Sequence, residues 1–208
     1  MLQTQTVTGA ALDVLKELMQ MHELASFALV EGTNLSLLFG HRKSIDIDLF
    51  TNEPFNTEAV YNQLASKFSN IVLASQSETM LFVYINEVKT DLVLLPYPYL
   101  QPVEEIQGLR LVSVPDIAAM KLSAIARRGV KKDFWDIAEL LDEYSVEELI
   151  AFYKEKYSSH DIFHLLRSLV YFEDAETQVD PNPLKKMTWK QVKKKVQVAV
   201  QRYVDRSL

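Results

Sequence analysis

The chain has 208 residues, 48% of them hydrophobic and 24% charged, which is typical of a globular protein with a sizeable core. Its formal net charge of −6 excludes a protein that binds nucleic acid with its whole surface, so nucleic acid would have to meet a local basic face. The absence of cysteine excludes disulfides, thiol catalysis and cysteine-ligated zinc, and it fits a cytoplasmic protein.

The first half of the chain predicts short strands mixed with helices. Helices are expected at residues 8–25 after a capping Thr8, at 34–40 and at 57–68 after a cap at Asn56 or Thr57. Apolar or alternating runs predict strands at residues 27–30, 44–50, 70–75, 79–85, 88–97 and 109–114. Asn86-Glu87 is the expected hairpin turn between two of these strands.

From Pro115 onward the sequence predicts helices alone. They are expected at about residues 115–128, 132–143, 145–156, 160–172 and 188–206, with a polar loop before the last. Mixed strands around few helices favour an α+β fold over a doubly wound one. We therefore expect a mixed-sheet domain at residues 1–114 and an all-helical bundle at residues 115–208. No apolar run is long enough to span a membrane, so we expect no membrane partner.

Two aspartates interrupt the apolar run "SIDIDLF". In a strand, Asp46 and Asp48 would project from one face about 6.6 Å apart at Cα, while Ile45, Ile47 and Leu49 would point into the core. Two carboxylates at this spacing repel each other unless a cation lies between them. Mg²⁺ binds such hard oxygen ligands together with phosphate oxygens. The pair indicates a magnesium site, and the pattern alone leaves a water-facing edge strand as the alternative.

Three nearby features favour the metal site. The turn at Gly32 and Thr33 offers backbone N–H groups and a hydroxyl to an anion. Arg42 and Lys43 precede the aspartates closely in the sequence. Asp91 interrupts another apolar strand, and a third carboxylate there would complete a two-metal site for phosphoryl transfer.

Residues 115–141 hold a second group of charged residues. Lys121 lies in an apolar helix, either as a lysine whose stem covers the core while its ammonium reaches water, or as a point charge on phosphate. Asp133 and Asp136 lie near the start of the next helix, where carboxylates are favoured on electrostatic grounds alone. The basic residues of 127–132 either steer phosphate or form a solvated turn.

The C-terminal segment, residues 184–208, combines a valine stripe at helical spacing with six lysines. This pattern predicts an amphipathic helix docked by its apolar side, with a solvated basic face. A docking surface for tRNA or for an acidic partner is the alternative. His160 and His164 are spaced for one helix face, and we interpret them as surface or capping residues and not as metal ligands.

The two groups of residues together resemble a known family. Residues 32–50 read G-T-x-L-x-L-x-x-G-H-R-x-S-x-D-x-D-L-F, and residues 115–141 fit a second block, K-x-x-A…R…[RK]-D-x-x-D-[IL]. Both blocks, in this order, resemble those of the AbiEii/AbiGii-type nucleotidyltransferases of the DNA polymerase β-like superfamily. That family includes the toxin halves of certain bacterial toxin–antitoxin systems, and the resemblance covers most of residues 25–142.

The resemblance implies a nucleotidyltransferase-fold mixed sheet and a Mg²⁺-dependent enzyme that moves an NMP from an NTP to an RNA (tRNA) or protein acceptor. It also implies a toxin with a cognate antitoxin protein as partner. One position departs from the family, because Glu31 stands where glycine is usual. The departure leaves a degenerate nucleotidyltransferase that binds nucleotide or a partner without turnover as the alternative. A non-enzymatic interaction protein with surface aspartates is the other alternative.

The resemblance further implies a role for individual residues. The expected metal ligands are Asp46, Asp48 and Asp91, which together with Lys121 form the expected catalytic set. The residues expected to contact the nucleotide are Gly32, Thr33, Arg42, Ser44, Asp133 and Asp136.

Overall fold

The computed structural model describes residues 1–158 and 161–207, which form an α+β fold around one mixed sheet. The strand order is β3-β4-β5-β2-β1-β7-β6; β2 pairs in parallel with β5 and β1 with β7, and the other neighbours are antiparallel. The strands are β1 (Ala28–Leu29), β2 (Ile47–Thr51), β3 (Ile71–Gln76), β4 (Met80–Ile85), β5 (Val88–Leu94), β6 (Glu104–Ile106) and β7 (Leu109–Leu111).

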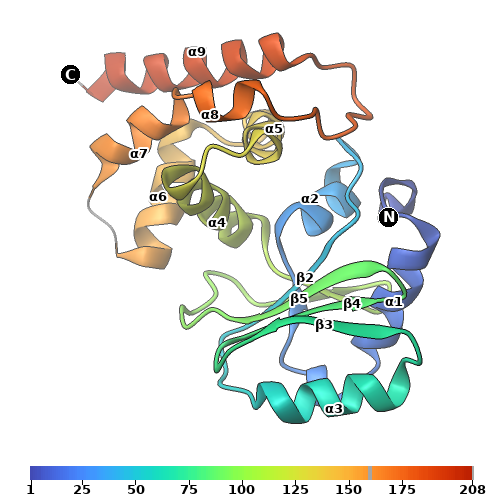
Figure 1. Cartoon of the computed structure of the whole chain (residues 1–208). Coiled ribbons are helices and arrows are strands. Elements are labelled where there is room, and N and C mark those ends of the chain that lie inside the picture. The colour runs from blue at the N-terminus through green and yellow to red at the C-terminus, as the bar shows by residue number, and fades with distance from the viewer. Residues whose placement is uncertain (159–160, 208) are drawn as a thin grey trace.

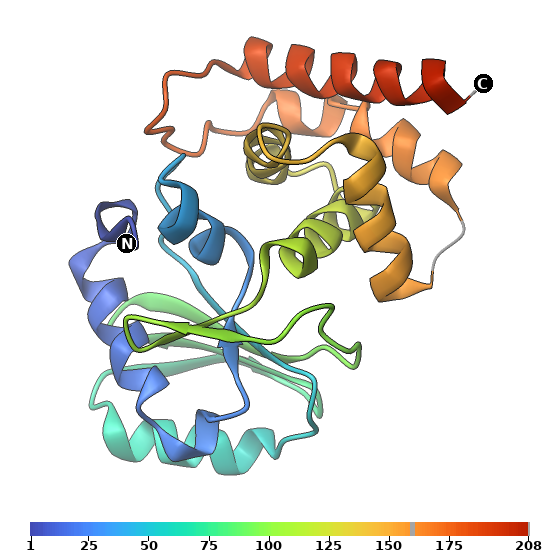
Figure 2. The ribbon, with the colours of Figure 1, turned by 180° about the vertical axis from the view of Figure 1, so that it is seen from behind.

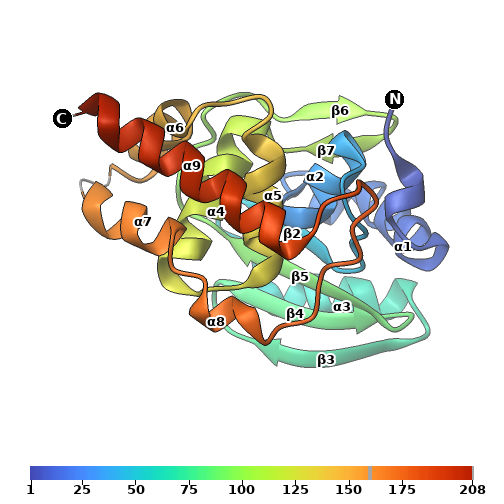
Figure 3. The same ribbon diagram turned by 90° about the horizontal axis from the view of Figure 1, so that it is seen from above.

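Helices cover both faces of the sheet (Figures 1 and 2). In the first half the helices are α1 (Gly9–Met19), α2 (Glu31–Phe39) and α3 (Thr57–Lys67). In the second half they are α4 (Val114–Arg127), α5 (Lys131–Leu140), α6 (Val146–Tyr157), α7 (Ile162–Leu169), α8 (Glu173–Glu176) and α9 (Trp189–Ser207). Seen from above, α9 crosses the outer side of the helical half (Figure 3).

Alternation along β2 assigns its side chains to two hydrophobic clusters. Ile47 and Leu49 are fully buried in the first cluster, together with apolar residues of α1 and α3. Phe50 points the other way and packs on the second cluster, which is built mainly from α4 to α9. Asp48 shares the face of Phe50, because successive side chains of a strand point to opposite faces. The strand therefore presents Asp48 toward the helical half.

Several predicted local features are confirmed. The Thr8 side chain accepts a hydrogen bond from the backbone of Ala11 and caps α1, and Asn56 caps α3 in the same way. Asn86 and Glu87 both have positive φ, at 50° and 67°, as a tight hairpin turn between twisted antiparallel strands requires.

Other local predictions were wrong. Ile45 is 63% exposed, because β2 begins only at Ile47 and the alternation does not reach it. Helix α2 begins at Glu31, three residues before the predicted start. Strand β6 and helix α8 were missed, since both are short and rich in glutamate. The helix predicted at residues 160–172 ends at Leu169, and residue 160 lies outside the described residues.

The described residues contain no helix with both the length and the apolar character needed to cross a membrane. The division of the chain into domains at residues 1–114 and 115–208 stays a prediction. The two parts share a hydrophobic cluster. Ala28 of β1, Val30 and Leu35 of α2 pack in the cluster of the helical half.

A buried ion pair joins the helical half to the loop after β5. The Lys156 ammonium lies 2.7 Å from Asp116 Oδ1, and both side chains are fully buried. Asp116 also accepts hydrogen bonds from the backbone N–H groups of Leu100 and Gln101, and Lys156 donates to the carbonyl of Pro98. This pair thus fixes α4, α6 and the loop to one another.

We expect Asp116→Asn to lower the free energy of unfolding by about 3–5 kcal/mol, because it leaves the buried Lys156 charge without its partner. Urea unfolding followed by circular dichroism measures the loss. Glu17→Ala is the control, since it removes an exposed pair with Lys67 at 3.6 Å and should cost less than about 1 kcal/mol. Equal losses in the two variants would contradict the role of the buried pair.

Candidate active site

Two aspartates meet where β2 and β5 run side by side. Asp48 and Asp91 are register partners on these parallel strands, so their Cα atoms are about 4.8 Å apart. Their neighbours Leu49 and Leu92 are register partners buried in the first cluster, so both carboxylates lie on the opposite face. Asp91 Oδ2 accepts a hydrogen bond of 2.5 Å from Lys89, whereas its Oδ1 is buried and has no hydrogen-bond partner among the described residues.

The surroundings of Asp48 disfavour its ionised form. Burial, followed by the negative charges of Glu31 and Asp91, raises the pKa of Asp48 to about 7. The positive charges of Lys121 and Lys89 oppose this rise without cancelling it. In the protein without ligand, burial and the neighbouring negative charges therefore disfavour a charged Asp48. A bound cation would offset this effect.

Asp46 precedes β2 and has different neighbours. Its carboxylate lies 3.4 Å from the ammonium of Lys132, and both side chains are partly exposed. Its backbone carbonyl accepts a short hydrogen bond from the hydroxyl of Thr33, which lies 2.8 Å from the hydroxyl of Ser44. Thr33 is fully buried, so this contact ties the start of α2 to the loop that leads into β2.

The carboxylates of Asp48 and Asp91 fit a magnesium ion chemically, since they are hard oxygen ligands and one Asp91 oxygen lacks a partner. Within residues 1–158 and 161–207, however, no group of three or more histidines or carboxylates is close enough together to hold a metal ion. The third expected ligand, Asp46, pairs with Lys132. The structure places Asp48 and Asp91 side by side, and the role of all three residues as metal ligands stays a prediction.

Lys121 lies at the centre of a buried ionic network. Its ammonium is 2.5 Å from Glu31 Oε2, 2.8 Å from Asp133 Oδ1 and 2.9 Å from Asp136 Oδ2. The side chain is 1% exposed, so the interpretation of Lys121 as a lysine reaching water is wrong. Burial alone would lower the pKa of Lys121, but the charges of these carboxylates hold it well above its usual value.

Asp136 joins the network to the loop after α2. Arg42 binds it through two hydrogen bonds, from Nε to Oδ1 at 2.6 Å and from Nη2 to Oδ2 at 2.8 Å. His41 Nε2 lies 2.8 Å from Oδ1. Burial alone would raise the pKa of Asp136, but the charges of Arg42 and Lys121 hold it well below its usual value.

Gly32 makes room for this arrangement. A Cβ atom at position 32 would lie 2.0 Å from Arg42 Nη2, far inside van der Waals contact. Glycine therefore lets the guanidinium pass directly over the first turn of α2 on its way to Asp136.

Most of the residues expected to contact the nucleotide make contacts within the protein. Arg42, Asp133 and Asp136 are buried and contact one another or Lys121, and Gly32, Thr33 and Ser44 shape the loop around them. Their contact with a nucleotide stays a prediction. Sequence reasoning missed the pairing of Lys89 with Asp91, although a spacing of two residues in a strand places both side chains on one face.

The basic residues of 127–132 divide between two environments. Lys131 is buried and pairs with Asp180 at 3.2 Å, and Lys132 pairs with Asp46. Arg127 and Arg128 line a pocket of about 270 Å³ that Glu31 borders on one side. The pocket also contains Tyr97 and Tyr157, whose rings meet edge to face with centroids 4.8 Å apart.

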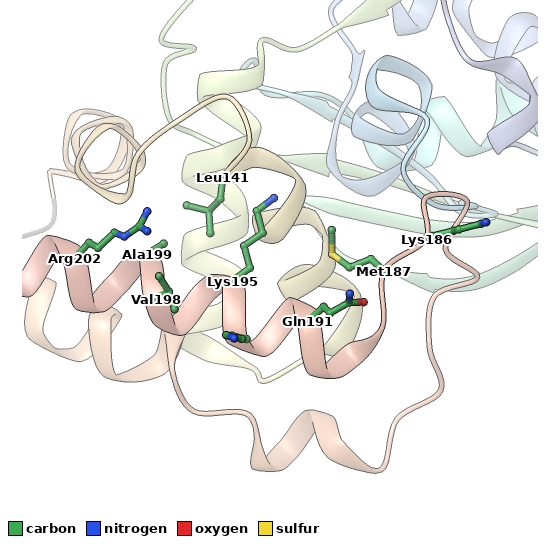
Figure 4. Close-up of a pocket in the computed structure, with 9 residues that line it drawn as sticks. Leu141, Lys186, Met187, Gln191, Lys195, Val198, Ala199 and Arg202 are labelled. Carbon is green, nitrogen blue, oxygen red and sulfur yellow. The ribbon is translucent and has the colours of Figure 1, made fainter.

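The predicted apolar stripe of the last helix is confirmed, because Val192, Val196 and Val200 of α9 are buried in the second cluster. Three of its flanking lysines pair with acidic residues; these pairs are Lys185–Glu139, Lys193–Glu176 and Lys195–Asp142. A pocket of about 480 Å³ is lined by residues that include Lys195 and Arg202 of α9 and Leu141 at the end of α5. Figure 4 shows these side chains. The choice between a solvated face and a docking surface stays open.

His164 lies outside both groups. Its Nε2 atom is 3.1 Å from the backbone carbonyl of Ala126, which agrees with a surface residue that makes a local contact. Its expected neighbour in the sequence pattern, His160, lies outside the described residues.

Comparisons with known proteins agree with the fold. The sequence model of a family described as "Nucleotidyl transferase AbiEii toxin, Type IV TA system" matches residues 77–206. An uncharacterized protein of Aquifex aeolicus (strain VF5) is 34% identical over 187 residues, which cover 86% of this chain and 88% of that protein.

Solved structures show the same architecture. A putative nucleotidyltransferase from Helicobacter pylori matches with a TM-score of 0.58 at 17% identity, over 96% of each chain. The nucleotidyltransferase toxin MenT4 from Mycobacterium tuberculosis H37Rv matches with a TM-score of 0.51 at 14% identity, over 94% of this chain and 89% of that one. At these identities the likeness shows the fold, and it confirms the predicted nucleotidyltransferase fold. Together with the match to the family model, it places the chain in the AbiEii nucleotidyl transferase toxin family of type IV toxin–antitoxin systems.

Proposed function

We propose that this nucleotidyltransferase uses Mg²⁺ to move a nucleoside monophosphate from an NTP to an RNA (tRNA) or protein acceptor in the cytoplasm. In this proposal it is the toxin component of a toxin–antitoxin system and has a cognate antitoxin protein. The observation that carries the proposal is the pairing of Asp48 with Asp91 on adjacent parallel strands, with one buried Asp91 oxygen lacking a hydrogen-bond partner. Two such carboxylates side by side are a site for a cation.

The residues divide the chemical work between them. Asp48 and Asp91 would hold Mg²⁺, which when bound offsets their repulsion and stabilises negative charge on the triphosphate. Asp46, which pairs with Lys132 in the free protein, would be the third ligand. The acceptor hydroxyl oxygen forms a bond to the α-phosphorus, the bond from that phosphorus to the bridging oxygen breaks, and pyrophosphate leaves. Asp91 would either accept the hydroxyl proton or complete the metal site, in which case the proton would pass to water.

The pocket beside Glu31 supports nucleotide binding next to the carboxylates. Arg127 and Arg128 offer positive charge for phosphate oxygens, and Tyr97 and Tyr157 offer aromatic surface for a base. Such a site accelerates the reaction mainly by positioning the reactants and by electrostatic stabilisation.

A second candidate function is nucleotide binding without turnover. It is favoured by one observation, the complete pairing of Lys121 with Glu31, Asp133 and Asp136 in the protein without ligand. If this pairing persists in the complex, the three carboxylates keep a phosphate away from the Lys121 ammonium.

Asp48→Asn should lower nucleotidyl transfer at least about 10²-fold, because it removes one of two adjacent carboxylates that would hold the metal. Purified protein is incubated with Mg²⁺, each labelled NTP in turn, and total RNA or cell protein, and labelled product and released pyrophosphate are counted. Asp13→Asn, an exposed position on α1, is the matched control and should keep wild-type activity. Transfer by the Asp48→Asn variant at the wild-type rate would overturn the mechanism.

Asp48→Asn should also stabilise the metal-free protein at pH 8, by about 1 kcal/mol or more. The folded-state pKa of Asp48 is raised from 3.8 to about 7, so the folded protein keeps a proton that the unfolded chain has released. The free energy of unfolding of the wild type therefore falls as pH rises between these values, and the difference between variant and wild type should disappear near pH 4.

Urea unfolding in EDTA at pH 4, 6 and 8 measures this pH dependence, with Asp13→Asn as the control. Adding Mg²⁺ at pH 8 should stabilise the wild type and have a smaller effect on Asp48→Asn, because binding to the folded state alone raises stability. A gain in stability that is the same at all three pH values would contradict the assigned pKa of Asp48.

A further inference from the structure

The ammonium group of Lys121 is enclosed by three carboxylates: it donates a hydrogen bond to Asp133 and forms ion pairs with Glu31 and Asp136. A protonated lysine carries three N–H donors, and three carboxylates lie within 3 Å of this nitrogen, those of Glu31, Asp133 and Asp136. A phosphate oxygen could contact Lys121 only if one of these carboxylates moves away.

Glu31 is held less firmly than the two aspartates. The side chains of Asp133 and Asp136 are fully buried, whereas that of Glu31 is 17% exposed. Asp136 is also fixed by Arg42 and His41, while Lys121 is the one ion-pair partner that Glu31 has among the described residues. Of the three, Glu31 is the carboxylate that can leave at the lowest cost.

The backbone at Glu31 is strained as well. Its φ of 59° lies in the left-handed region, which a residue with a Cβ atom seldom adopts. Val30, the residue before α2, provides no side-chain hydrogen bond to cap the helix and to stabilise this conformation. Strain of this kind persists where surrounding contacts hold it, and the ion pair with Lys121 is a contact of this residue.

The charge balance of the buried network also distinguishes Glu31 from the two aspartates. Lys121 and Arg42 bring two positive charges into the buried network, and Asp133 and Asp136 balance them. Glu31 adds a third carboxylate, and its charge also opposes the ionisation of Asp48. The network therefore stays balanced when Glu31 leaves, and the side of the Lys121 ammonium that Glu31 occupied is then open to another anion.

Glu31 stands at the entrance to this network. It borders the pocket that contains Arg127, Arg128 and Tyr157, whereas Lys121 does not line that pocket. An anion that enters the pocket thus meets Glu31 before it reaches Lys121.

We propose that Glu31 is an anionic gate on Lys121. In the free protein its carboxylate occupies the position beside the Lys121 ammonium that a phosphate oxygen of the nucleotide occupies in the complex, so that nucleotide binding must displace it. The gate rests on the proposed function, since it assigns the Lys121 contact to the nucleotide. It weakens the binding of every anion at Lys121, so that only an anion with several further contacts, such as a triphosphate, still binds tightly.

Two variants test the gate. Glu31→Gln removes the charge at constant size, and Glu31→Gly also removes the backbone strain. Glu87 provides a matched control, because it is an exposed glutamate with φ of 67° in the turn between β4 and β5. Glu87→Gln and Glu87→Gly make the same changes in charge and backbone away from the site.

Calorimetric titration with inorganic tripolyphosphate, in magnesium-free buffer with EDTA, measures the effect. Both Glu31 variants should bind the probe about tenfold more tightly than the wild type, while the Glu87 variants should bind it as the wild type does. A misfolded variant would not gain affinity, so a gain is specific. Binding by the Glu31 variants that is equal to or weaker than that of the wild type, or absent from both, would overturn the gate.

The transfer assay separates this inference from the proposed function. If the wild type transfers nucleotide in an Asp48-dependent manner and the Glu31 variants gain no affinity, the gate is wrong and the function stands. If the Glu31 variants gain affinity and no protein transfers nucleotide, the function is wrong, and the gate on anion binding stands.

Discussion

The carboxylate of Asp136 is a buried point at which the two halves of the chain are joined. It is fully buried, and it binds Arg42 and His41 from the loop after α2 as well as Lys121 from α4. Unpaired, any of these charges would be too costly to bury, so the network exists only as a whole. It fixes the loop that leads into β2, and with it the position of Asp48 above the sheet.

Next to this network lies a group of carboxylates whose negative charge the neighbouring lysines do not fully compensate. Glu31, Asp48 and Asp91 lie near one another, and Lys89 and Lys121 compensate only in part, so that the pKa of Asp48 stays raised. Repulsion between these carboxylates lowers the free energy of unfolding of the protein without ligand. This trade between stability and function is common at binding sites, where cations and substrates supply the missing interactions.

Much of the fold could be predicted from sequence, because it rests on local patterns. Alternation in "SIDIDLF" placed Ile47 and Leu49 in the core and Asp48 on the other face, and caps such as Thr8 marked helix starts. The environment of Lys121 could not be predicted in this way. Helical periodicity gives the face of a residue, but not that carboxylates from α2 and α5 converge on that face. Ile45 was misplaced since no pattern shows where pairing with β5 begins.

The parallel pairing of β2 with β5 also bears on how the protein is made. The strands that carry Asp48 and Asp91 are joined through α3, β3 and β4, and the contact of Arg42 with Asp136 spans 94 residues. Contacts this distant in sequence form late in folding, after the loops between them have closed. A ribosome-bound fragment that ends before α5 lacks the carboxylates that hold Arg42 and Lys121. During synthesis the complete site can therefore form only when most of the chain has emerged from the ribosome and folded.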